Sequence, residues 1–223
     1  MLRRNLKSKL FSTIGSLSVA GLMLAGVATV AYTVSSPRPA RADQSTVPPV
    51  PTNIQVPTGN KVFLVGHGVG TQNYVCLASG SGFAWTLFTP QATLFGEDGG
   101  QVITHFFSPN PSEPNTNPRV VSPGGTIRVT WQHSRDGSTV WGQVKSGNAA
   151  VVDPNAIPWL LVTAVGAKAG PTGGDVLTAT TFIQRLSTTG GLAKAADCSS
   201  SGDIGKQAFI PYTADYFFYK KAV

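Results

Sequence analysis

The stretch from residue 126 to 145, TIRVTWQHSRDGSTVWGQVK, places the strongest constraint on how this chain can fold. Asp136-Gly137 separates two runs of alternating residues. Asp-Gly between such runs favours a two-residue type I′ turn, because both central residues of that turn need positive φ. The turn would pair Trp131 with Gly142, so that the indole lies over bare backbone. The stretch therefore predicts a half-buried antiparallel hairpin.

Alternation divides the predicted hairpin into two faces. One face is mostly apolar: Ile127, Val129, Trp131, His133, Val140, Gly142 and Val144. The other face is polar except for Trp141. A tryptophan among short polar side chains can stack on a sugar ring or a peptide, so we predict a ligand site made of Trp141, Gln132, Thr139 and Gln143. The alternative is that another sheet or the proline-rich loop covers this face, since large aromatic residues are mostly buried.

The rest of the chain is typical of short strands separated by Gly, Pro, Ser and Asn. The runs are 61–65, 72–77, 83–88, 92–95, 101–107, 159–165, 176–186 and 214–220. No segment shows a helical period. The pattern predicts a single all-β domain over residues 58–223, either an antiparallel β-sandwich or a barrel-like sheet. The proline-rich loop at 108–125 is long for a connection between antiparallel strands.

The glycines after the first run do not make a dinucleotide site. The fingerprint needs a third glycine that opens a helix, whereas Gly66, Gly68 and Gly70 are followed by a β-type run. We therefore interpret these glycines as a turn between two strands, and we predict no cofactor.

The N-terminal part is typical of an export leader. Basic residues precede an apolar stretch at about 14–34, and Ala40-Arg41-Ala42 offers a cleavage site. Residues 1–42 are thus predicted to be a signal peptide or, because the apolar stretch nearly reaches bilayer length, an uncleaved membrane anchor. Residues 43–57 are proline-rich and are predicted to be a spacer. The protein is expected to be secreted or extracytoplasmic.

The net charge of +7 comes mostly from this leader. Six of the 17 basic residues precede Asp43 and all 10 acidic residues lie at or after it, which leaves 11 basic and 10 acidic residues, a net charge of +1. The remainder therefore gives no electrostatic case for a nucleic-acid partner.

The two cysteines, Cys76 and Cys198, both follow the leader. An even pair in an exported protein favours a disulfide, and the alternative is two buried thiols.

The histidines give only a weak case for chemistry. None of them forms a close pair such as H-x-H, so we predict no metal site. His105 and His133 both alternate with apolar residues, which is more typical of core histidines. We predict a non-catalytic binding or structural module, with an extracellular carbohydrate or cell-envelope polymer as its partner. The alternative is an extracellular hydrolase or metal-dependent enzyme that uses His105, His133 and Asp136.

A series of short motifs runs through the chain in order: 70–76 (GTQNYVC), Ala84-Trp85, His105, Asp136-Gly137-Ser138, 156–161 (AIPWLL), 183–186 (IQRL), Gly190-Gly191, Cys198, Pro211-Tyr212 and 216–219 (YFFY). The series resembles an uncharacterised family of secreted proteins, filed as domain of unknown function 3455, over about residues 57–220. In relatives the counterpart of His105 stands just before a short Gly-Pro-Thr-Trp stretch, whereas here residues 108–129 intervene. The resemblance implies a secreted β-rich domain and no established activity.

Overall fold

The computed structural model describes residues 46–115 and 125–222. Its strands are β1 (Asn60–Ser79), β2 (Gly82–Phe95), β3 (Gln101–Pro109), β4 (Ile127–His133), β5 (Thr139–Ala150), β6 (Trp159–Lys168), β7 (Phe182–Gly190) and β8 (Gln207–Lys221). The predicted signal peptide or anchor at residues 1–42 lies outside the described residues, as does part of the loop at 108–125. In the described part of the chain, no helix has the length and apolar character needed to cross a membrane.

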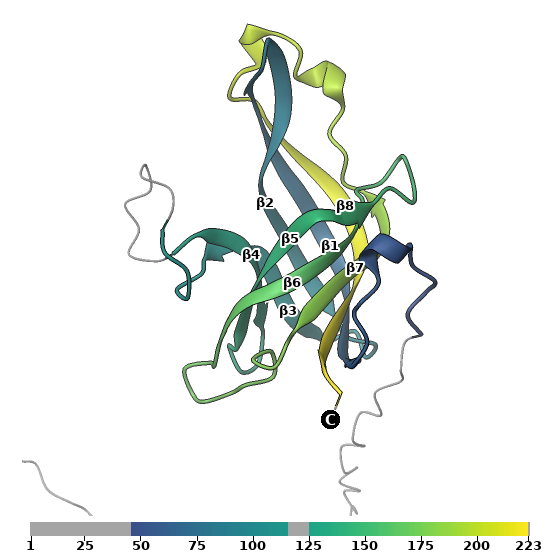
Figure 1. The fold of residues 1–223 in the computed structure, drawn as a ribbon. Helices are drawn as coiled ribbons and strands as arrows, with labels where there is room; N and C mark the ends of the chain where they lie inside the picture. Colours follow the sequence, from purple (N-terminus) through teal and green to yellow (C-terminus); the bar gives the residue numbers. More distant parts are fainter. Residues whose placement is uncertain (1–45, 116–124, 223) are drawn as a thin grey trace, which may run out of the picture. The chain divides into compact units, whose positions relative to one another are not determined.

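Each strand pairs antiparallel with the next, and β8 pairs with β1, so the sheet closes into a barrel (Figure 1). The predicted all-β antiparallel fold is confirmed, and of the two predicted architectures the structure has the barrel. Its interior is filled by the larger of two apolar clusters, made of Ala92, Leu94, Ile103, Trp131, Val140, Ile157, Val162, Leu177, Ile183, Tyr212, Ala214, Tyr216 and Phe218.

β1 is one strand of 20 residues where the sequence predicts two strands and a glycine turn. The turn prediction is wrong because the glycines serve packing inside the strand. A Cβ on Gly68 would lie 2.8 Å from the ring of Tyr216, and a Cβ on Gly70 would lie 2.1 Å from the carbonyl oxygen of Gln91. The glycines therefore let neighbouring backbone and a core tyrosine approach β1 closely.

β4 and β5 form the predicted hairpin, but they pair two residues away from the predicted register. Trp131 lies opposite Val140 rather than Gly142. The predicted type I′ turn is also wrong, because of its two central residues only Gly137 has a positive φ, 71°. The loop has four residues, 134–137, closed by a bond from the amide of His133 to the carbonyl of Ser138 (2.9 Å). Within it, the amide of Gly137 donates to the carbonyl of His133 (3.0 Å). Because the shift is two residues, every side chain keeps its predicted face.

Residues 46–57, which we name the strap, lie along the outside of the barrel. The strap contains the 3-10 helix η1 (Thr52–Ile54), and Ile54 is completely buried. The amide of the Gln184 side chain donates to the carbonyl of Ile54 (2.7 Å), and Asn53 Nδ2 donates to two carbonyls of β5 (2.8 and 2.9 Å). Ile54 packs in a second apolar cluster with outward side chains of β6, β7 and β8: Leu161, Leu186, Phe217 and Tyr219. The segment predicted as a spacer thus adds to the hydrophobic core.

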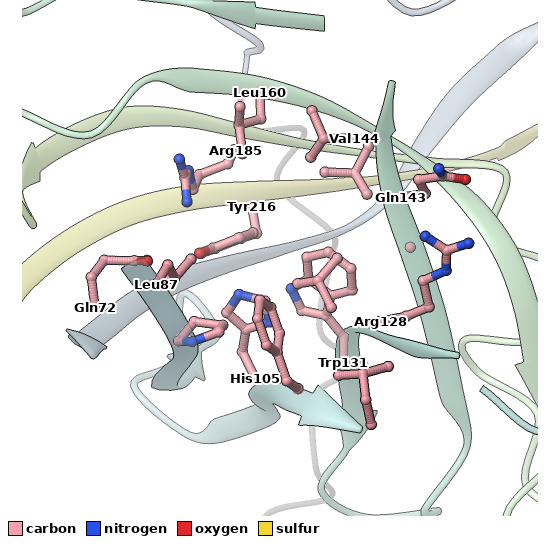
Figure 2. A pocket seen from close by; sticks show the side chains of 16 residues that line it. Gln72, Leu87, His105, Arg128, Trp131, Gln143, Val144, Leu160, Arg185 and Tyr216 are labelled. Atoms are coloured by element: carbon pink, nitrogen blue, oxygen red, sulfur yellow. The ribbon is translucent and has the colours of Figure 1, made fainter. Parts of the chain in front are cut away.

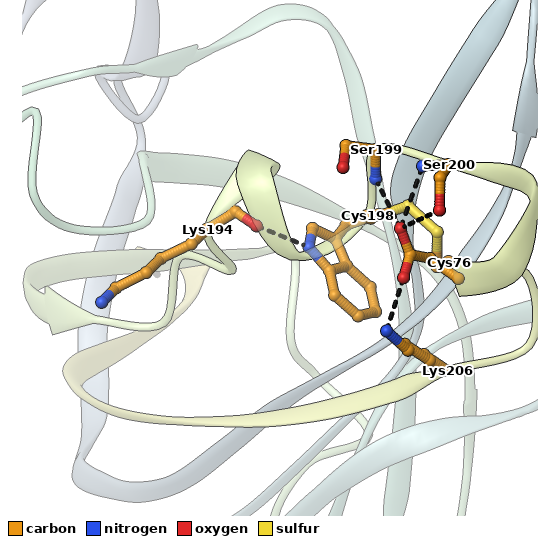
Figure 3. Close-up of a disulfide and its surroundings, with 8 residues drawn as sticks. Cys76, Lys194, Cys198, Ser199, Ser200 and Lys206 are labelled. Atoms are coloured by element: carbon orange, nitrogen blue, oxygen red, sulfur yellow. Dashed lines mark hydrogen bonds and ion pairs between the residues drawn. A yellow bond between two sulfur atoms is a disulfide. The ribbon is translucent and has the colours of Figure 1, made fainter.

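β1, β2 and β8 continue beyond the barrel as a three-stranded extension (Figure 1). In the described residues, 82–91 of β2 and 207–211 of β8 pair only with β1. The predicted disulfide between Cys76 and Cys198 is confirmed, with its Cα atoms 5.6 Å apart (Figure 3). Trp85 Nε1 donates to the carbonyl of Lys194 (2.8 Å) beside it. These contacts hold the β7–β8 connection, with η2 (Ala195–Asp197) and η3 (Ser201–Asp203), against the extension.

Candidate functional site

A cavity of about 320 Å³ lies inside one end of the barrel, and every strand contributes to its lining (Figure 2). Its rim is partly exposed, with Leu87, Ile127 and Val144 between 37% and 44% accessible. Its deeper part is closed by His105, Trp131 and Tyr216, which are at most 2% accessible. The other end of the barrel is filled by core side chains that do not line the cavity, including Leu94, Ile103 and Phe218. The cavity is therefore a blind pocket with one mouth.

His105 and Trp131 form the deep wall of this pocket. Their rings stack at a centroid distance of 4.6 Å and an interplanar angle of 14°. The two residues are direct partners across β3 and β4, so the intervening residues 108–129 do not separate them. Burial lowers the pKa of His105 to about 3, and its Nδ1 lies 2.9 Å from the carbonyl of Thr130. The imidazole is thus neutral near pH 7, with its proton on Nδ1 because a carbonyl can only accept.

A second wall of the pocket is polar. Tyr216 lines this wall, and its hydroxyl lies 2.9 Å from that of Tyr212, which does not line the pocket. Burial raises the pKa of both tyrosines, and the nearby positive charge of Arg185 acts in the opposite direction. Arg185 itself donates from Nε and Nη2 to the carbonyl of Pro158 (3.3 and 2.8 Å). Gln72 lies on the same side of the pocket, and Figure 2 shows it with Arg185 and Tyr216 opposite Arg128 and Gln143.

Arg128, at the opposite side, is held by a carboxylate. Its Nε and Nη2 donate to the two oxygens of Glu113 (2.8 and 2.6 Å), and Asn110 Nδ2 donates to the same carboxylate (2.7 Å). The hydrogen bonds from Arg128 lower the pKa of Glu113, and they outweigh the opposing effect of burial. Most of the positive charge on this side is thus balanced within the protein.

The predicted ligand face around Trp141 is covered, as the alternative interpretation had it. Trp141 is only 6% accessible, and its Nε1 donates to Ser108 Oγ (2.9 Å). The expectation of an exposed stacking platform is wrong because the chain turns back over this face after β3, where the buried Asn110 reaches the carbonyl of Val165 (3.3 Å). Thr139 is buried, and Gln132 is exposed but lies away from the pocket. Of the four predicted ligand residues, only Gln143 lines the pocket.

The three residues of the enzyme alternative do not converge. His105 lines the pocket, whereas His133 and Asp136 do not. Asp136 Oδ1 lies 2.8 Å from His133 Nδ1, and its carboxylate accepts from the amides of Ser138 and Val176 (2.9 and 3.0 Å). Burial opposes ionisation of Asp136, but these hydrogen bonds outweigh it and hold its pKa well below the usual range. Asp136 therefore fastens the β6–β7 connection to the hairpin turn, and that connection places Leu177 in the core.

His67 has carboxylate neighbours that the sequence did not reveal. Its Nδ1 lies 2.7 Å from Asp215 and its Nε2 lies 3.1 Å from Glu97, outside the pocket. The hydrogen bond to Asp215 is the main cause of a raised pKa at His67. Even so, among residues 46–115 and 125–222 no three His, Cys, Asp or Glu side chains are grouped to hold a metal ion.

Sequence reasoning also missed Arg185 and Gln72 as lining residues. One signal for Arg185 was available: it alternates with Ile183 in a predicted strand, so both face the same side. Gln72 carried no such signal, because its burial depends on where the extension leaves the barrel.

The fold and the pocket together define a class: a closed eight-stranded antiparallel barrel with a blind internal pocket. Within that class, the chain belongs to the family described as a protein of unknown function, DUF3455, whose model matches residues 57–220. Comparisons with curated proteins and with solved structures find no match.

Proposed function

We propose that this protein is a non-catalytic binding module that takes a small organic ligand into the lumen of the barrel. The observation that carries the proposal is the blind pocket of about 320 Å³, which combines an apolar lining with a few polar groups. Eight strands give a barrel interior that is either just filled by side chains or wide enough for one small ligand. Here the interior is filled at one end and open at the other, and the volume lies within the usual range for ligand pockets.

The disulfide supports a place of action outside the cytoplasm, because such bonds persist in oxidising compartments. The predicted export leader points the same way. We therefore propose that the ligand is met in an extracytoplasmic space, and the test below uses the mature chain from Asp43.

The test is binding of N-phenyl-1-naphthylamine, a neutral apolar dye that fluoresces when it leaves water. The wild-type chain should bind it with one saturable site. Val144→Trp should abolish or strongly weaken this binding, because Val144 lines the mouth and a larger ring there blocks it. Val152→Trp is the matched control, since Val152 is similarly exposed, 48% accessible, but does not line the pocket.

Equal loss of dye binding in both tryptophan variants would place the dye elsewhere on the surface. Absence of saturable binding in the wild-type chain would contradict the proposal directly.

A further inference from the structure

The two arginines of the pocket differ in how their charge is balanced. Arg128 is paired with Glu113, whereas Arg185 takes part in none of the ion pairs among the described residues. The guanidinium of Arg185 contacts a backbone carbonyl and the hydroxyl of Tyr216, which stays protonated, and its charge also acts on the pKa of Tyr212. Because an arginine carries its charge at every relevant pH, the polar wall keeps a positive charge that no carboxylate of the described chain offsets.

The same pocket contains two buried N–H donors without a partner. Gln72 Nε2 and Trp131 Nε1 are inaccessible to solvent and make no hydrogen bond within the described residues. Gln72 lies near enough to Tyr212 to influence its pKa, but not in hydrogen-bonding geometry. A buried donor left unsatisfied is costly, but these two N–H groups have almost no accessible surface, so a ligand atom cannot reach them as the side chains stand. Among the described residues, the charged group that the pocket presents without an ion-pair partner is thus Arg185.

We propose that the lumen site selects an organic anion, with an oxyanion head on an apolar body. The head is bound by the guanidinium of Arg185. The body lies against apolar lining residues such as Val129, Leu160 and Val162. This inference rests on the proposed function, since it names the chemistry of the ligand in that same pocket.

Two dyes with the same ring system test the anion directly. 8-Anilinonaphthalene-1-sulfonate is N-phenyl-1-naphthylamine with a sulfonate added. The wild-type chain should bind the sulfonate about tenfold more tightly or better, because a hydrogen-bonded charge pair is worth about 1.5–3 kcal/mol and each 1.4 kcal/mol is a factor of ten. Added salt should weaken binding of the sulfonate dye and leave binding of the neutral dye unchanged.

Arg185→Gln should remove the preference for the sulfonate and leave the affinity for the neutral dye within about twofold, since only a charged interaction is lost. Arg135→Gln, an exposed arginine on the hairpin turn, is the matched control and should change neither affinity. Binding of the neutral dye by each variant also reports that the barrel has folded.

Three results would overturn the inference. Equal affinity of the wild-type chain for the two dyes would mean that the pocket does not prefer an anion. If Arg185→Gln still bound the sulfonate dye as much more tightly than the neutral dye as wild type does, this arginine would not be the group that binds the anionic head. Failure of the wild-type chain to bind either dye would remove the proposed function as well, so the two failures are distinguishable.

Discussion

Gly137 is the residue on which the hairpin turn depends most. Its φ is 71°, and a Cβ there would lie 3.0 Å from Cδ of Pro171 in the β6–β7 connection. A β-branched residue is strongly disfavoured at such a φ. The turn carries the carboxylate of Asp136, which accepts a hydrogen bond from Val176 in that connection. A change of backbone conformation at Gly137 therefore affects both the hairpin turn and the β6–β7 connection.

Gly137→Val should lower the free energy of unfolding by about 1–3 kcal/mol, the usual cost of a strained backbone residue. Denaturant unfolding of the two chains measures the difference. Gly147→Val is a useful comparison, because Gly147 also has a positive φ but a Cβ there would meet nothing within 4 Å. A Gly137→Val chain as stable as wild type would show that the turn does not hold this conformation.

Individual residues also show where sequence reasoning failed at the site. Trp141 and Trp131 were separated correctly onto opposite faces by alternation. Which face is open, however, depends on Asn110 and the chain after β3, and those residues pack on the hairpin only in the tertiary structure. The prediction placed the ligand on the polar face, whereas most hairpin residues that line the pocket belong to the apolar face and only Arg128 and Gln143 belong to the polar one.

Among the elements, the strap is the one whose packing differs most plainly from the sequence prediction, since Ile54 is completely buried. It is proline-rich, and its sequence alone is typical of a solvated linker. It packs instead because β6, β7 and β8 carry outward apolar residues that no other strand covers. Such residues are hard to assign from sequence, since a strand with two apolar faces does not alternate.

Ile54→Ala should therefore cost about 2–5 kcal/mol of unfolding free energy, as expected for truncating a fully buried isoleucine. Ile204→Ala is the control, because Ile204 is 50% accessible and should change the stability by less than about 0.5 kcal/mol. Thermal or denaturant unfolding of both variants provides the comparison. Similar stabilities for the two variants would mean that the strap does not pack in solution.

The element order itself was largely predictable. The predicted runs and the two hairpin strands correspond to the strands of the barrel, after 61–65 merged with 72–77 and 83–88 merged with 92–95. The run 176–186 was wrong in its first half: residues 176–179 form a turn, because the amides of Val176 and Leu177 bond to Asp136 and Ser138, and β7 begins only at Phe182. Closure could not be predicted, since it requires β1 to pair with β8 across most of the chain. The hairpin register was missed by two residues because Asp136 bonds to the turn backbone and widens the loop.

For the whole molecule, His105 should contribute to the loss of stability on the acid side, together with Glu113 and Asp136, whose pKa values are lowered. The pKa of His105 is about 3 in the folded chain, whereas the ordinary value for a histidine side chain is 6.5. Between these values the unfolded chain binds a proton that the folded chain does not, so stability rises with pH across this window and is lost as pH falls through it. His67 acts in the opposite sense, because its raised pKa stabilises the fold below 6.5 and this contribution is lost as pH rises through the folded value.

The slope of the unfolding free energy between about pH 6 and pH 4 should therefore flatten in His105→Asn, which keeps an N–H donor but does not titrate. His67→Asn should leave that slope unchanged, lower the unfolding free energy below pH 6.5 by a constant amount, and change the slope only above pH 6.5. Urea unfolding at a series of pH values measures both. An unchanged slope in His105→Asn would show that the buried ring is not held neutral.

The filled end of the barrel limits how a long molecule can be bound. Leu94, Ile103 and Phe218 occupy the interior beyond the pocket, so a chain cannot pass through the lumen. A polymer longer than the pocket can insert only a terminus, and its interior segments stay outside. The number of protein molecules that one polymer binds through this pocket is then set by its count of free ends and does not grow with its length.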